Sequence, residues 1–279
     1  MTTPISVAAL IQCLEAWAPP TWQESWDNSG WQVEPGVGDQ PAHVLVCLTP
    51  TWAVLEEALE LRRQRQGVNL ILAHHPLIFS PLKALTQGDP VGQMVYQAIT
   101  HGIGIYSAHT NFDQVSGGTA DILAQQLDLQ GAEPVVPTQP EVGYGRVGNL
   151  SPARPLKELL QHIQDTLKPP RLIYSLAADL HQPIHRLAVL GGSGASFLGA
   201  VAKTGAQAYL TADAKFHQFQ EARDRGVILI DAGHYATERP ACNALVNWVR
   251  HQGAAWADLS QQDEDFRQFF AANPDGMSA

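Results

Sequence analysis

Three segments of the chain place histidine directly after an apolar run, and two of them add a carboxylate within one helical turn. Imidazole and carboxylate are donors that divalent transition metals take in proteins, so their recurrence predicts a metal site. In α/β folds such groups gather where strands end at their carboxyl edge. The side chains that we expect to hold a pair of divalent ions are His74, His75, Asp113, His234 and Glu238.

The histidine pair follows the apolar run at residues 68–73. Adjacent side chains on a strand point to opposite faces, but that rule ends with the strand, and Pro76 restricts His75 to extended or turn geometry. His74 and His75 could then each serve a different ion. A pair of histidines at the surface or at the edge of the core, without any ligand, is the simpler interpretation.

The other two segments have helical spacing. His109 and Asp113 are four residues apart, as are His234 and Glu238, so one helical turn would put each pair on one face. Asp113 could instead cap the turn before the glycine pair that follows it. Glu238 could instead be the polar start of a helix at residues 241–249, where a carboxylate suits the positive helix end. Each segment is weak evidence alone, and the three together favour metal binding.

The charge of such a centre indicates its substrate. Two divalent ions would bring about four positive charges, which Asp113 and Glu238 would reduce to about two and a bridging hydroxide to about one. The centre would stay electropositive in a chain whose net charge is −10, and it would attract a small anionic or phosphate-bearing molecule. The acidic chain as a whole disfavours nonspecific binding to nucleic acid or anionic membranes.

The elements that must position these side chains alternate along the chain. Runs of strand length lie at residues 44–48, 68–73, 103–108, 172–176, 187–190, 208–211 and 227–230. Helical periodicity covers residues 7–17, 51–65, 91–100, 118–127, 156–167, 195–203 and 241–249. This alternation predicts an α/β fold with helices covering mostly buried sheets. A segment rich in Pro and Gly at residues 131–154 divides the chain into an N-terminal lobe, 1–130, and a C-terminal lobe, 131–279, or marks the waist of one bilobed domain.

The composition is that of a folded globular protein, because 45% of the 279 residues are apolar and 16% are charged. Three widely spaced cysteines disfavour both a disulfide framework and a cysteine zinc site, and they favour reduced thiols. The N-terminus lacks the pattern of a signal peptide, and no apolar run is long enough to cross a bilayer. We therefore expect a cytoplasmic protein without a membrane partner.

Four motifs resemble the NIF-three-like proteins, which are often described as GTP cyclohydrolase 1 type 2 homologues. The motifs lie at residues 26–30, 74–79, 107–113 and 232–235 with Glu238, and a looser match lies at 210–213 with His217. They follow the order of the family and span nearly the whole chain. The resemblance implies a two-lobed α/β fold of layered sheets flanked by helices, with a dinuclear metal site in the cleft between the lobes.

The resemblance also implies a division of the ligands. His75 and Asp113 would hold one ion, His74 and His234 the other, and Glu238 would bridge them. Family members tend to form ring-shaped hexamers, and the short stretch between the two halves of this chain indicates a form without an inserted domain. Imidazole and carboxylate ligation suits zinc, iron, manganese or cobalt.

Two positions depart from the family pattern. Thr49 stands where an acidic residue is usual, and Ala212 stands where Gly is common. Neither change touches the five expected ligands, so the departures concern the substrate cleft.

Three further features have two interpretations each. The glycine-rich residues 191–194 follow a strand and precede a helix, which suits either tight packing or phosphate binding, although the P-loop pattern is incomplete. Trp22, Trp26 and Trp31 suit buried packing or base stacking. His217 suits proton transfer or a structural role in the second lobe.

Two functions fit these observations. In the first, the protein is a metal-dependent hydrolase, in which two ions about 3.5–4 Å apart activate a shared water. The water would attack a nucleotide-like substrate such as GTP, and His109 or His217 would transfer the proton. In the second, the protein is a non-catalytic metal-binding oligomer that serves as a platform or regulatory partner. The fold and the metal site alone do not identify the substrate.

Overall fold

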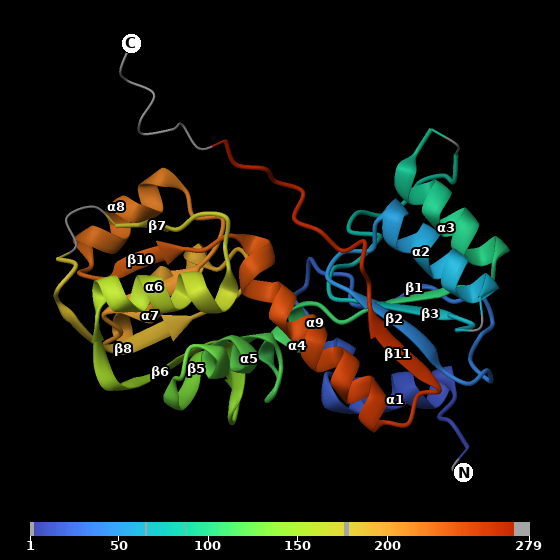
Figure 1. Cartoon of the computed structure of the whole chain (residues 1–279), viewed down its shortest axis with the longest axis horizontal. Helices are drawn as coiled ribbons and strands as arrows, with labels where there is room; N and C mark the ends of the chain where they lie inside the picture. The colour runs from blue at the N-terminus through green and yellow to red at the C-terminus, as the bar shows by residue number, and fades with distance from the viewer. Residues whose placement is uncertain (1–2, 65, 87, 176–178, 271–279) are drawn as a thin grey trace.

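The computed structural model describes residues 3–64, 66–86, 88–175 and 179–270, which form two sheets joined by a long helix. Figure 1 shows the first sheet on the right, the second on the left, and helix α9 (His234–His251) running between them. The first sheet has the order β1-β4-β3-β2-β11, and the second has the order β5-β6-β8-β9-β10-β7. The layered α/β fold expected from the sequence is confirmed.

The first sheet is mainly parallel. Its strands are β1 (Gly30–Val33), β2 (His43–Cys47), β3 (Leu70–Ala73), β4 (Gly104–Ser107) and β11 (Trp256–Leu259). Only β1 runs antiparallel to its neighbour. Because β11 pairs with β2, the end of the chain returns to the first sheet, and a division at residue 130 separates the two sheets except for this strand.

Alternation of apolar side chains explains how helices cover both faces of the first sheet. Val44 and Val46 point into one core and Leu45 and Cys47 into the other, as expected for successive residues of a strand. The first core is closed by α1 (Val7–Trp17) and α9, and the second by α2 (Trp52–Arg63) and α3 (Pro90–Thr100). Ser6 caps the N-terminus of α1, since its hydroxyl accepts a hydrogen bond from the amide of Ala9.

The second sheet also carries helices on both of its faces. Its strands are β5 (Gln130–Gln139), β6 (Val142–Pro155), β7 (Ile173–Tyr174), β8 (Pro183–Val189), β9 (Ala208–Thr211) and β10 (Ile228–Asp231). Its faces are covered by α5 (Thr119–Gln126) and α6 (Leu156–Leu167) on one side and by α7 (Leu198–Lys203) and α8 (Phe216–Asp224) on the other. The short helices η1 (Pro20–Trp22), α4 (Thr110–Gln114) and η2 (Ala195–Phe197) complete the described chain.

The segment that we interpreted as a boundary is a hairpin. β5 and β6 are the longest antiparallel pair of the second sheet, and β5 lies at its edge. The prolines of β5 suit an edge strand, because such a strand needs fewer amide donors. Gly143 and Gly145 of β6 are in positive-φ conformations that only glycine adopts readily. Composition alone therefore concealed two strands.

Other expectations need smaller corrections. β1 and β11 were not predicted, and α9 begins at His234, seven residues before the expected helix start. The strand expected at 172–176 is limited to β7, and residue 176 of the expected strand lies outside the described part of the chain. None of the helices among the described residues combines the length and hydropathy that a bilayer crossing requires.

A buried arginine connects the second sheet to helix α4. Arg146 of β6 is 2% exposed, pairs with Asp121 of α5, and donates to the carbonyl of Gln114 at the end of α4 at 3.3 Å. Removing the carboxylate would leave a buried cation without its partner. Asp121→Asn should therefore lower the free energy of unfolding by about 3 kcal/mol, measured by urea denaturation of the metal-free protein.

The matched control is Asp128→Asn, because Asp128 pairs with Arg154 where its side chain is 56% exposed. Exposed ion pairs contribute little, so this change should cost less than about 1 kcal/mol. Equal losses in the two variants would contradict the structural role of the buried pair.

Candidate metal centre

The carboxyl ends of both sheets deliver the predicted side chains. In the first sheet, Ala73 pairs with Ser107, so the segments after β3 and β4 leave the same edge. In the second sheet, Asp231 pairs with Thr211, so the segments after β10 and β9 also share an edge. His74 and His75 follow β3, His109 and Asp113 follow β4, and His234 and Glu238 follow β10.

His74 presents a bare nitrogen. Its ring is fully buried, and Nδ1 lies 2.7 Å from the carbonyl of Ala108, which can only accept. Nδ1 therefore carries the proton, and Nε2 keeps its lone pair. Within the described chain this Nε2 has no hydrogen-bond partner. A buried acceptor without a partner is costly, and a metal ion would satisfy it.

His75 and His234 meet at the carboxylate of Glu238. Nε2 of His75 lies 2.9 Å and Nε2 of His234 2.8 Å from Oε2 of Glu238, and the two nitrogens are 3.3 Å apart. The other nitrogen of each ring is engaged: His75 Nδ1 contacts the Thr49 hydroxyl at 2.8 Å, and His234 Nδ1 contacts Asp213 at 2.7 Å. Such outer contacts fix the orientation of metal-binding imidazoles.

The second oxygen of Glu238 faces the other side of the cluster. Its Oε1 lies 3.9 Å from Nε2 of His74, and that nitrogen lies 3.6 Å from Oδ1 of Asp113. The ligand division implied by the family pattern stays a prediction, and the proximities of the side chains differ from it. His74, not His75, is the imidazole beside Asp113, and His75, not His74, is the one beside His234.

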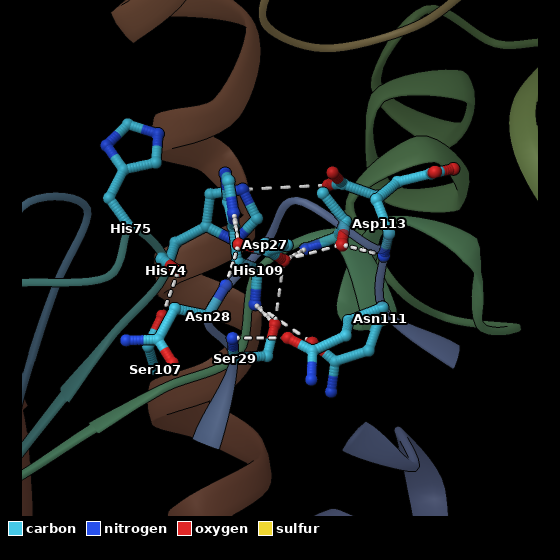
Figure 2. A network of polar contacts seen from close by, with 12 residues as sticks. Asp27, Asn28, Ser29, His74, His75, Ser107, His109, Asn111 and Asp113 are labelled. Atoms are coloured by element: carbon cyan, nitrogen blue, oxygen red, sulfur yellow. Dashed lines mark hydrogen bonds and ion pairs between the residues drawn. The ribbon is translucent and has the colours of Figure 1, made fainter. Parts of the chain in front are cut away.

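His109 lies in the same cluster. Its donor atom lies within 4.8 Å of those of His74 and His75, and a second such group consists of His75, His234 and Glu238. Nδ1 of His109 contacts Asp27 at 2.7 Å, and the Asp27 side chain is fully buried. Figure 2 shows this network of Asp27, His109 and their neighbours. Asp27 belongs to the motif at residues 26–30, whose spacing alone did not indicate a contact with His109.

Burial controls the charges of the cluster. It lowers the pKa of His74 to about 3, so this imidazole is neutral and its lone pair is available. Burial and the nearby Glu238 raise the pKa of Asp113 to about 7. Burial alone would lower the pKa of His234, but Glu238 and Asp213 raise it to about 10. Burial opposes the charge of Glu238 as well, yet His234 holds its pKa well below the usual range.

The donor set fits divalent cations. Several imidazoles and two carboxylates converge, and a proton on His234 now balances Glu238. Metal ions would replace that proton and satisfy the bare nitrogen of His74. The simpler interpretation of Glu238 as the polar start of a helix at residues 241–249 is wrong, because Glu238 is 4% exposed and lies inside helix α9.

A cavity of about 540 Å³ opens onto the cluster between the two sheets. Its wall includes His75, His109, Asp113, His234 and Glu238. The structure does not bring His217 there. That histidine is exposed on α8 and lines a separate hollow with Glu221 and Arg225.

The glycine-rich loop after β8 lies against Glu238. A Cβ atom at Gly192 would stand 2.0 Å from Oε1 of Glu238, so only glycine allows this approach. The amide of Gly192 donates to the Thr237 hydroxyl at 3.0 Å, and that of Gly194 donates to the Thr211 hydroxyl at 3.0 Å. The packing interpretation of this loop therefore agrees with the structure.

Comparisons with known proteins place the chain in one family. The family model Duf34/NIF3 (NGG1p interacting factor 3) matches residues 5–261. A Nostoc protein named GTP cyclohydrolase 1 type 2 homolog is 62% identical over 266 residues, which cover 95% of this chain and 99% of that protein. A Streptococcus pneumoniae protein of the same name is 34% identical, over 81% of this chain and 83% of its own.

Solved structures share the fold. A Bacillus cereus protein related to NIF3 superposes with a TM-score of 0.87 at 22% identity, over 96% of this chain and all of that one. A hypothetical protein from Staphylococcus aureus gives a TM-score of 0.83 at 24% identity, with the same coverage. At this identity the likeness concerns the fold alone.

The contact between Gly192 and Glu238 can be tested by substitution. Gly192→Ala would push the carboxylate out of the cluster, so the purified variant should retain less than half of the divalent metal of the parent protein, measured by elemental analysis. The matched control is Gly131→Ala, because Gly131 has φ +60° against +63° at Gly192 and its Cβ would meet nothing within 4 Å. Equal metal content in both variants would contradict a metal role for Glu238.

Proposed function

Because the chain belongs to the Duf34/NIF3 family, we propose that it is a metal-dependent hydrolase that acts on a nucleotide-like small molecule at a dinuclear centre. The observation that carries this proposal is the position of Glu238. One carboxylate oxygen faces His75 and His234, and the other faces His74 beside Asp113. A carboxylate so placed suits two cations better than one.

The proposed ligands divide by proximity. His74 and Asp113 would hold one ion, His75 and His234 the other, and Glu238 would bridge them. Bound divalent ions would polarise the substrate and lower the pKa of water towards neutrality. The metals that suit this set are zinc, iron, manganese and cobalt.

The chain's own groups supply positioning and proton transfer. His109 lines the cavity, and its Nδ1 donates to the buried Asp27, so Nε2 is the atom that can accept or release a proton. This contact with Asp27 raises the pKa of His109 against the opposing effect of burial. His109 is therefore the candidate for proton transfer that the geometry favours over His217.

GTP is the first substrate to test, because the Nostoc and Streptococcus relatives carry the name GTP cyclohydrolase 1 type 2 homolog. The purified protein, loaded with each candidate metal, would be incubated with GTP and with a panel of nucleotides and phosphoesters. Absence of turnover across that panel would favour the alternative, a non-catalytic metal-binding platform. The hexameric state and the cytoplasmic location remain predictions, which solution scattering and fractionation would test.

Substitution of Glu238 tests the bridging role. Glu238→Gln keeps the shape of the side chain but removes its charge, so bound metal should fall below one ion per chain and turnover should fall at least about 100-fold. The control is Glu221→Gln on the exposed face of α8, which should match the parent in both measurements. If Glu238→Gln loses the oligomeric state and the parent protein shows no activity, the non-catalytic metal-binding platform is favoured.

Substitution of His109 separates proton transfer from metal binding. His109→Asn should leave the metal content unchanged and lower turnover by about 10²–10⁴-fold, because general acid–base groups contribute on that scale. Elemental analysis and steady-state rates would be measured on the same preparation. If metal is lost together with activity, His109 is a ligand and the proton-transfer role is wrong.

A further inference from the structure

The wall of the cavity beyond the metal cluster is unusually aromatic. Trp26 and Phe79 lie next to each other with ring centroids 6.0 Å apart, and both side chains are 58% exposed. Both line the cavity, and the Trp26 ring also contacts the ring of His109 at 6.1 Å. Of the two interpretations of Trp26, buried packing is wrong, because the side chain is exposed. Its neighbours Trp22 and Trp31 do pack against the core.

A second aromatic pair reaches the cavity from the other sheet. Tyr144 of β6 and Phe197 of η2 are stacked, with ring centroids 5.4 Å apart and an interplanar angle of 28°. The Tyr144 hydroxyl accepts a hydrogen bond from Gln114 at 2.8 Å, which fixes the ring. Each of the two sheets therefore contributes one aromatic pair to the same cavity.

The described wall of the cavity carries acidic side chains but no lysine or arginine. Of the described residues that line the cavity, Glu24 is the one charged side chain outside the metal cluster. Glu24 and Tyr144 line the same cavity, and burial together with Glu24 raises the pKa of the Tyr144 hydroxyl. A phosphate group would find no lysine or arginine here, and the amides of Gly192 and Gly194 in the glycine-rich loop already donate to threonine hydroxyls.

We propose, in an inference that rests on the proposed function, that the chain recognises a flat, uncharged nitrogen heterocycle of its substrate, which stacks on the two aromatic pairs. Flat rings stack on aromatic side chains whatever their substituents, because every such ring has a π-face. A ring edge with two adjacent N–H donors, as in guanine, would complement the carboxylate of Glu24. Any phosphate of the substrate would interact with the bound ions alone.

Isothermal titration calorimetry with three probes tests this selection. Guanosine should bind the metal-loaded and the metal-free protein with dissociation constants within about threefold, because the aromatic wall and Glu24 do not depend on the ions. GTP should bind more tightly than guanosine only when metal is present. Ribose 5-phosphate should show no binding to the metal-free protein. Binding of ribose 5-phosphate that equals or exceeds that of guanosine would overturn the inference.

Variants locate the ring. Phe197→Leu and Trp26→Leu should each weaken guanosine binding about tenfold, and Glu24→Gln should reduce the preference for guanosine over adenosine. The matched control is Phe216→Leu, because Phe216 is 89% exposed and does not line the cavity. Unchanged affinity in both aromatic variants, with folding verified by circular dichroism, would also overturn the inference.

The result is separable from that of the proposed function. Guanosine binding that depends on Phe197, without hydrolysis of any tested compound, would support the inference and reject the hydrolase. Hydrolysis of a phosphoester without a ring, together with no guanosine binding, would support the hydrolase and reject the inference.

Discussion

The structure depends on placing one carboxylate, that of Glu238, between imidazoles that come from different sheets. A buried carboxylate is costly unless it is paired, and here His75 and His234 lie within 2.9 Å of it. The first histidine follows the first sheet and the second begins the helix that joins the sheets. Gly192 allows the second sheet to approach this carboxylate, since any side chain there would occupy the same space. The same contacts that gather the ligands therefore fix how the two sheets meet.

Around this carboxylate, the outer contacts come from distant parts of the chain. At Thr49, where the resemblance implied an acidic residue, the hydroxyl contacts His75 at 2.8 Å and so orients that ring. A carboxylate is also present nearby, because Asp263 accepts a hydrogen bond from the amide of Leu48 at 2.8 Å. Arg267 contacts Asp213 at 3.1 Å, and Asp213 in turn contacts His234. The segment after β11 thus supports the cluster from outside.

The sequence predicted what depends on local pattern and missed what depends on long-range contact. Apolar runs located β3, β4 and β10, and parallel pairing brought the ends of β3 and β4 together, so the neighbourhood of His74 and His109 was predictable. The approach of His234 depends on the contact between the two sheets, because β10 pairs with β9 in the second sheet. Which of two adjacent histidines lies beside Asp113 depends on backbone geometry after the strand, which periodicity does not describe. Asp263 lies 215 residues from the amide that it binds, and no spacing rule connects them. The β5–β6 hairpin was missed because its edge position tolerates Pro, which composition associates with loops.

The absence of lysine and arginine from the described cavity wall connects the metal site to selectivity. In most phosphate-binding sites, guanidinium or ammonium groups supply positive charge permanently. Here the wall beyond the metal cluster supplies aromatic rings and the carboxylate of Glu24, so positive charge outside the imidazoles of the cluster would come from bound ions. Attraction of an anionic group would then be conditional on metal, whereas stacking of a ring would not. Recognition of the ring and recognition of the anionic group would therefore have separate physical sources within one cavity. The acidic net charge of −10 would disfavour binding of anions elsewhere on the molecule.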